Sequence, residues 1–138
     1  TLIYLGEVAP SILPHVTAAV DRVCAALPPF ACRAYGWGFF GTKRMPNTLW
    51  AGVDPSRQLE ALHERLWLEL KKFGFKDEGP DFRPHITLAR DYKPDGDIGG
   101  IPPGKRRFTV DEVILFESRR EEGRLVYAPL YSYRLQTR

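Results

Sequence analysis

Apolar residues recur every three or four positions in two long segments of the chain, which is the spacing of a helix with one buried face. The first segment begins at Pro10-Ser11 and is ended by Pro28-Pro29. The second follows Asp54, which we expect to be the N-cap with Pro55 at the first helical position, and it closes at Gly74. The two apolar stripes are Leu13, Val16, Val20, Val23 and Leu27, and Leu59, Leu62, Leu66, Leu70 and Phe73. The pattern therefore predicts two amphipathic helices.

Aromatic and β-branched residues concentrate between and after these helices and predict strands there. We expect strands over residues 30–40 and 48–53 and a further strand around His85, while residues 1–8 look like the end of another strand. The segments expected to be loops are 41–47, 76–81 and the proline- and glycine-rich 92–104, which we expect to be exposed and mobile. Because a strand followed by a helix occurs twice, the chain is predicted to form two similar lobes.

The last third of the chain predicts a hairpin. Segments 107–118 and 124–135 are expected to pair across 119–123, whose charges and glycine suit a turn. The apolar residues of the first segment change from one set of alternate positions to the other near Asp111-Glu112. A β-bulge at that point would reconcile the two halves.

Composition is that of an ordinary globular domain. The 138 residues are 43% hydrophobic and 27% charged, and we expect residues 1–138 to form a single domain. No apolar run approaches the ~20 residues needed to cross a bilayer, and the first residues lack the layout of a signal peptide. We therefore expect a cytoplasmic protein with no membrane association.

Charge and cysteines exclude little. A net charge of +3 is compatible with a polyanionic substrate but much weaker than that of a dedicated nucleic-acid coat protein. Cys24 and Cys32 lie in no Cys-x-x-Cys or His-rich context, so they form no zinc or redox motif and are expected to be buried or idle thiols.

The strand around His85 places an imidazole and a hydroxyl on one face. Successive side chains of a strand point to opposite faces, so His85 and Thr87 project together while Ile86 and Leu88 pack on the other side. An imidazole, with a pKa of about 6.5, can serve as acid or base near neutral pH, and a hydroxyl can bind a phosphoryl oxygen. The alternative is a half-buried strand histidine without a catalytic role.

An ordered series of motifs covers nearly the whole chain. Residues 82–90 are Phe-Arg-Pro-His-Ile-Thr-Leu-Ala-Arg, and the opening residues look like the end of a second His-x-Thr-Leu strand whose His would fall two places before Thr1. The other members are Gly36-x-Gly38-x-Phe40, Thr-Leu-Trp-Ala-Gly-Val at 48–53 and Leu-Phe-Glu-Ser at 115–118. This series resembles the two-histidine (2H) phosphoesterase superfamily and, within it, the RNA 2′,3′-cyclic phosphodiesterase family, also called 2′-5′ RNA ligase.

The resemblance implies an α+β fold that is bilobal and pseudo-twofold, with antiparallel sheets lining a central cleft and helices outside. It places a strand and a helix before the first motif, so we expect the N-terminal strand and helix of this fold to be missing from the chain. It also implies hydrolysis of RNA 2′,3′-cyclic phosphodiester ends to a 2′-phosphomonoester, with His85 and the upstream His as the acid-base pair.

Thr1, Thr87 and Arg90 would bind the phosphate according to the same resemblance. His85 would activate the water, although the sequence cannot assign which histidine is the acid and which the base. Arg90 has the opposite parity to His85 in a regular strand. Either the strand ends or bulges near Ala89 and turns Arg90 inward, or Arg90 is a surface charge; the resemblance favours the first.

Lys43 and Arg44 lie in a predicted loop beside Phe40. Cations next to aromatic side chains suit unpaired bases, so these three residues are candidate substrate-binding residues. The same aromatic side chains would also suit a core.

Two further histidines are not expected to take part. His15-Val16-Thr17 also spells His-x-Thr, but residues two apart in a helix lie about 200° apart around its axis, so these side chains cannot converge on one ligand. His63 falls inside the second predicted helix and is expected to be a solvated residue.

The implied chemistry requires no metal and no cofactor. A second possibility is ligation, in which a 2′-5′ RNA ligase joins the 2′,3′-cyclic end of a tRNA half to a 5′-hydroxyl. A third is a non-catalytic RNA-binding module, favoured if the segment before Thr1 lacks its His. We expect a monomer whose partner is RNA or a nucleotide with a 2′,3′-cyclic phosphate.

Overall fold

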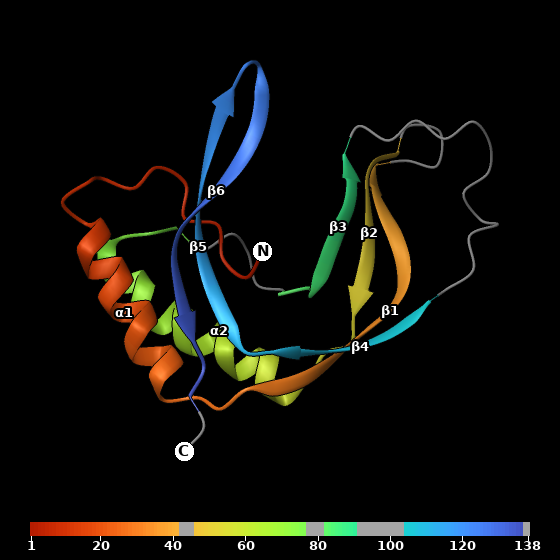
Figure 1. The fold of residues 1–138 in the computed structure, drawn as a ribbon, viewed down its shortest axis with the longest axis horizontal. Coiled ribbons are helices and arrows are strands. Elements are labelled where there is room, and N and C mark those ends of the chain that lie inside the picture. Colours follow the sequence, from red (N-terminus) through yellow and green to blue (C-terminus); the bar gives the residue numbers. More distant parts are fainter. Residues whose placement is uncertain (42–45, 77–81, 91–103, 137–138) are drawn as a thin grey trace.

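The chain folds into two antiparallel sheets and a pair of helices (Figure 1). The structure, a computed structural model, describes residues 1–41, 46–76, 82–90 and 104–136. Its elements are α1 (Leu13–Ala25), β1 (Phe30–Gly41), β2 (Pro46–Val53), α2 (Arg57–Leu70), the 3-10 turn η1 (Lys71–Phe73), β3 (His85–Arg90), β4 (Lys105–Val110), β5 (Glu112–Glu121) and β6 (Arg124–Arg134). One sheet has the strand order β3-β2-β1-β4, and the other is the β5-β6 hairpin. The predicted α+β class is confirmed.

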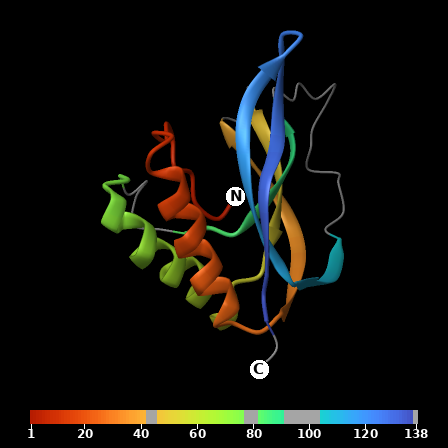
Figure 2. The ribbon, with the colours of Figure 1, turned by 60° about the vertical axis from the view of Figure 1, so that its left-hand side comes forward.

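Both predicted helices are present, and their apolar stripes form the core. The helices lie side by side (Figure 2), with Val16 of α1 and Leu62 of α2 fully buried. Phe30 and Val53 complete the core from the large sheet, and Tyr133 does so from the hairpin. Leu27 and Phe73, at the ends of the two stripes, pack against this core and are only partly buried.

The start of α2 differs from the prediction, because Ser56 is the N-cap rather than Asp54. The Ser56 backbone is extended and its Oγ accepts a hydrogen bond from the Leu59 N–H at 3.1 Å. The Asp54 carboxylate instead forms an ion pair with Arg33 of β1, whose Nη2 lies 2.6 Å from Oδ2. Asp and Ser both cap helices well, and here the Asp54 carboxylate is bound to Arg33, which leaves Ser56 as the cap.

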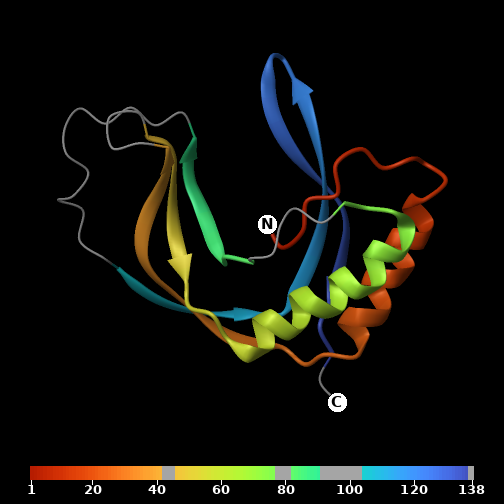
Figure 3. The ribbon, with the colours of Figure 1, turned by 180° about the vertical axis from the view of Figure 1, so that it is seen from behind.

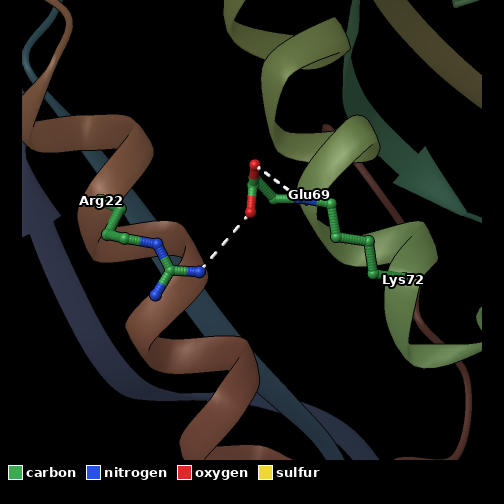
Figure 4. Close-up of polar contacts among 3 residues, drawn as sticks. All are labelled: Arg22, Glu69 and Lys72. Carbon is green, nitrogen blue, oxygen red and sulfur yellow. Dashed lines mark hydrogen bonds and ion pairs between the residues drawn. The ribbon is translucent and has the colours of Figure 1, made fainter.

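An ion-pair cluster joins the two helices on their exposed side (Figure 4). Glu69 of α2 accepts a hydrogen bond from Lys72 Nζ at 2.9 Å and lies 3.5 Å from Arg22 Nη2 of α1. The hydrogen bond from Lys72, followed by the Arg22 guanidinium, holds the pKa of the Glu69 carboxyl below its usual value. The charged form of Glu69 is therefore favoured in the folded protein.

The hairpin is confirmed, but the segment predicted to be its first strand is divided between two sheets. Residues before Asp111 form β4, which pairs with β1, and residues after it form β5, which pairs with β6. The predicted bulge at Asp111-Glu112 is therefore wrong. The change of parity marks the point where the chain passes from one sheet to the other, and a bulge would give the same sequence pattern. The turn is shorter than the predicted 119–123 and consists of Glu122-Gly123, both at positive φ, as a type I′ hairpin turn requires.

The opening segment is not a strand, contrary to the expectation for residues 1–8. Residues 1–9 have no regular secondary structure. Leu2, Ile3, Leu5 and Val8 are partly buried against the core, so this segment is held by apolar packing. Figures 1 and 3 show the N-terminus lying between β3 and the β5-β6 hairpin.

Both cysteines are buried, as expected. The side chains of Cys24 and Cys32 are 0% and 4% exposed. Burial raises the pKa of the Cys24 thiol to about 11 and also raises that of Cys32, so both stay protonated at neutral pH.

The three predicted loops cannot be compared in full, since residues 42–45 of the loop expected at 41–47 lie outside the described residues. Most of 76–81 and of 92–104, including the expected mobility of the latter, lies outside the described residues. Among the residues that are described, no helix is long and apolar enough to cross a membrane.

Candidate active site

His85 begins β3, which is one of the two edge strands of the large sheet. Pro84 restricts the backbone of Arg83 to extended conformations, and the Pro84 carbonyl accepts the Val53 N–H at 3.1 Å, which holds the entry of the strand. The half-buried imidazole turns back so that its Nδ1 lies 2.8 Å from the Arg83 carbonyl oxygen. A carbonyl can only accept, so Nδ1 carries the proton and Nε2 of the neutral ring is left with a free lone pair.

A β-bulge places Arg90 on the same face as His85 and Thr87. Gly52 pairs with His85 and Trp50 with Thr87, but Leu49 pairs with Ala89, so Leu88 is an extra residue without a partner on β2. Thr48 then pairs with Arg90. Paired residues share a face, and residues 48, 50 and 52 of β2 all point one way. The bulge that the first of the two alternatives for Arg90 required is therefore present near Ala89, and the exposed Arg90 shares the face of His85.

Aromatic side chains of β1 and β2 surround the His85 ring. Phe40, which is 45% exposed, stands edge-on to it at a centroid distance of 5.6 Å, and Trp50 lies 6.3 Å away. The Trp50 indole lies directly over Gly38, where any Cβ would overlap its ring. Phe40, predicted as a substrate-binding residue, thus lies beside His85.

Thr1 and His85 line the same cavity, which has a volume of about 110 Å³. Pro84 and Phe82 lead into it from the β3 side, and the rest of its wall is largely apolar, with Val53 and Phe108 from the large sheet. The first residue of the chain and the His85 strand, more than 80 positions apart, are brought together here.

The remaining histidines lie in the two helices. His15 is in α1, where Thr17 Oγ1 donates to the Pro14 carbonyl at 2.9 Å, so this His-x-Thr does not converge, as expected. His63 is in α2 as predicted, but it is half-buried and stacks on Phe82 at a centroid distance of 4.0 Å, so the expectation of a solvated side chain is wrong. Apolar contact with the segment before β3 covers this ring.

Two predicted substrate-binding residues cannot be placed, and the described residues contain no candidate metal site. Lys43 and Arg44 lie in the segment that the structure does not describe. Within the described part of the chain, no three His, Cys, Asp or Glu side chains gather as metal ligands would.

Tyr127 was not a candidate from the sequence, yet it contacts Arg90. The Arg90 guanidinium donates from Nη2 to the Tyr127 hydroxyl of β6 at 3.5 Å. The two residues are 37 positions apart and in different sheets, so no spacing pattern links them. They meet only because β3 and the β5-β6 hairpin face each other in the folded chain.

Comparison with known structures gives the class of the fold. The chain is similar to the crystal structure of E. coli LigT complexed with 3′-AMP, with a TM-score of 0.82 and 28% sequence identity, covering 99% of this chain and 76% of that one. The fold is that of the 2H phosphoesterases.

The sequence places the chain in a family. Residues 1–122 match the model of the 2′-5′ RNA ligase superfamily, and the chain belongs to this superfamily. It is 28% identical to the RNA 2′,3′-cyclic phosphodiesterase of Geobacillus stearothermophilus over 88% of this chain and 40% of that protein. It is 36% identical to the RNA 2′,3′-cyclic phosphodiesterase of Thermotoga maritima over 69% of this chain and 51% of that protein. The chain thus spans about half the length, or less, of these relatives.

Proposed function

We propose that this protein hydrolyses the 2′,3′-cyclic phosphodiester end of RNA to a 2′-phosphomonoester. The observation that carries the proposal is the gathering of His85, Thr87 and Arg90 on one face of β3, in a chain whose relatives are named RNA 2′,3′-cyclic phosphodiesterases. An imidazole, a hydroxyl and a guanidinium are the groups that acid-base cleavage of a phosphodiester needs.

The proposed mechanism gives His85 the role of general base. Its Nε2 accepts a proton from water as the water oxygen attacks phosphorus, while the Arg83 carbonyl holds the ring through Nδ1. The bond from phosphorus to the ribose 3′-oxygen breaks, and that oxygen takes a proton from the histidine expected two places before Thr1. Thr1, Thr87 and Arg90 bind the phosphoryl oxygens as their charge grows.

Substitution of His85 in the intact protein tests this function. We expect His85→Ala to lower kcat on a 2′,3′-cyclic nucleotide by about 10²–10⁴-fold, because the base is removed. His15→Ala is the matched control, since His15 lies in α1 outside the site. The product is identified by chromatography against 2′- and 3′-nucleotide standards. Retention of most of the activity in His85→Ala, or a 3′-phosphate product, would contradict the proposal.

Phe40 is proposed to contact the base next to the cyclic phosphate. Its half-exposed ring lies beside His85, and an aromatic face stacks on any base. Lys43 and Arg44 remain predicted contacts to the RNA backbone. A cytoplasmic location and a monomeric state also remain predictions. Cell fractionation would test the first, and sedimentation in the analytical ultracentrifuge would test the second.

Ligation is the second candidate, because the matching family model describes a 2′-5′ RNA ligase superfamily. The same groups serve both reactions, since a ribose 5′-hydroxyl attacks phosphorus in place of water and the same bond to the 3′-oxygen breaks. Hydrolysis and ligation yields measured side by side on one tRNA-half substrate would separate the two. We expect hydrolysis to predominate, since water is present at far higher concentration than any 5′-hydroxyl end.

A further inference from the structure

The β5-β6 hairpin carries large side chains that are exposed in unusual number for one element. Their exposed fractions are 49% for Phe116, 47% for Leu125, 51% for Tyr127, 40% for Leu130 and 47% for Tyr131. Exposed apolar groups that share one face, as Phe116, Leu125 and Tyr127 do, often mark a binding surface. Among them, Tyr127 contacts a residue of the proposed site, through its hydrogen bond with Arg90.

The register of the hairpin explains why Tyr127 points toward β3. Leu115 pairs with Tyr131, but the next residue, Phe116, pairs with Pro129, so Leu130 is an extra residue on β6. This bulge puts Tyr127 and Tyr131 on opposite faces of the hairpin, although an even number of positions, four, lies from one to the other. Tyr131 shares its face with the buried Tyr133, and Tyr127 shares its face with Phe116 and Ser118. Figure 3 shows this hairpin and β3 standing on either side of the N-terminus.

We propose that Tyr127 is a phosphate-binding residue supplied by the second sheet, an inference that rests on the proposed function. Arg90 Nη2 donates to the Tyr127 oxygen, so the phenol acts as acceptor and its own hydrogen remains available. A phosphoryl oxygen held by the Arg90 guanidinium lies within reach of that O–H. The anion then receives donors from β3 and from the hairpin at once.

The contact between Arg90 and Tyr127 is too weak to have stabilisation of the fold as its main role. Both side chains are exposed, and the hydrogen bond is long at 3.5 Å. An exposed contact of this kind contributes little to folding. We expect the contact to matter when an anion is bound, because the anion can accept hydrogen bonds from both the guanidinium and the phenol.

Tyr127→Phe isolates the hydroxyl because it keeps the ring. We expect kcat/KM on a 2′,3′-cyclic nucleotide to fall about 10- to 100-fold, the effect of losing one hydrogen bond to a charged group, with an unchanged melting temperature. Tyr131→Phe, the same change on the other face of the same strand, is the matched control and should stay within twofold of the unchanged protein. Equal losses in the two variants, or no loss in Tyr127→Phe, would overturn the proposal.

A double-mutant cycle tests whether Tyr127 acts together with Arg90. In an Arg90→Ala background, Tyr127→Phe should cost less than threefold, because the phenol is no longer oriented by the guanidinium. Costs that simply multiply would contradict this pairing and leave Tyr127 outside the phosphate site.

A binding measurement separates this inference from the proposed function. Calorimetry in the His85→Ala background should show that Tyr127→Phe weakens 2′-AMP about 10-fold or more and leaves adenosine unaffected, since only 2′-AMP carries the phosphate. Full activity of His85→Ala would refute the proposed mechanism, yet the 2′-AMP result would still decide the role of Tyr127. Equal weakening of both ligands would assign Tyr127 to the base or ribose and overturn its role as a phosphate donor.

Discussion

Gly38 is expected to control the position of the aromatic side chains beside His85. A Cβ at this residue would overlap Cζ2 and Cη2 of Trp50 and lie 2.9 Å from its Cε2. Gly38→Ala therefore forces the indole to move. Because Trp50 contacts both Phe40 and His85, the displacement reaches the proposed site.

The expected loss of stability follows from two opposed effects. Overpacking costs about 1–3 kcal/mol. Replacing a strand glycine by alanine otherwise stabilises by about 0.5–1 kcal/mol. Taking the middle of each range, the net destabilisation is about 1.25 kcal/mol, which at about 4 °C per kcal/mol lowers the melting temperature by roughly 5 °C. We also expect kcat to fall, by up to about 100-fold if the imidazole shifts by 1 Å.

Calorimetric melting tests the clash between the new Cβ and the indole. The loss of stability caused by Gly38→Ala is compared in the unchanged protein and in a Trp50→Phe background. Phe lacks the outer indole ring that a Cβ would meet, and Trp50 Nε1 has no hydrogen-bond partner among the described residues to lose. Gly38→Ala should therefore cost less than half as much in the Trp50→Phe background. Gly104→Ala is the control, because open space surrounds its Cβ position. The same cost in both backgrounds, or none in either, would refute the argument.

Two further predictions concern the helices. Ser56→Ala should lower the free energy of unfolding by about 1 kcal/mol in urea titrations through loss of the N-cap, whereas Asp54→Ala, which removes only an exposed ion pair, should cost about 0.5 kcal/mol; a larger cost for Asp54→Ala would restore Asp54 as the cap. The folded-state pKa of Glu69 is lowered, so its contribution to stability is present above the ordinary carboxyl pKa and is lost as the pH falls through the folded value. Glu69→Gln should therefore be less stable than the unchanged protein at pH 7 and equal to it near pH 2, and a gap that does not depend on pH would contradict this sign.

Several elements were predictable because their signals are local. The stripes of α1 and α2 repeat at helical spacing, and four of the five residues of each stripe lie within the helix itself. The shared face of His85 and Thr87 needs only the period of a strand. The N-cap was not predictable in this way, since Asp54 and Ser56 both suit the position and Asp54 is bound to Arg33, 21 residues away.

The sequence by itself determined the two helices, most of the strands and the His-x-Thr face, because each depends on backbone geometry within a few residues. Only the tertiary structure decided that β4 joins β1 while β5 joins β6, that a bulge at Leu88 turns Arg90 to the face of His85, and that Tyr127 meets Arg90 from the other sheet. These features depend on the register between strands distant in the chain. Register is fixed by packing of the whole core, which no local pattern encodes.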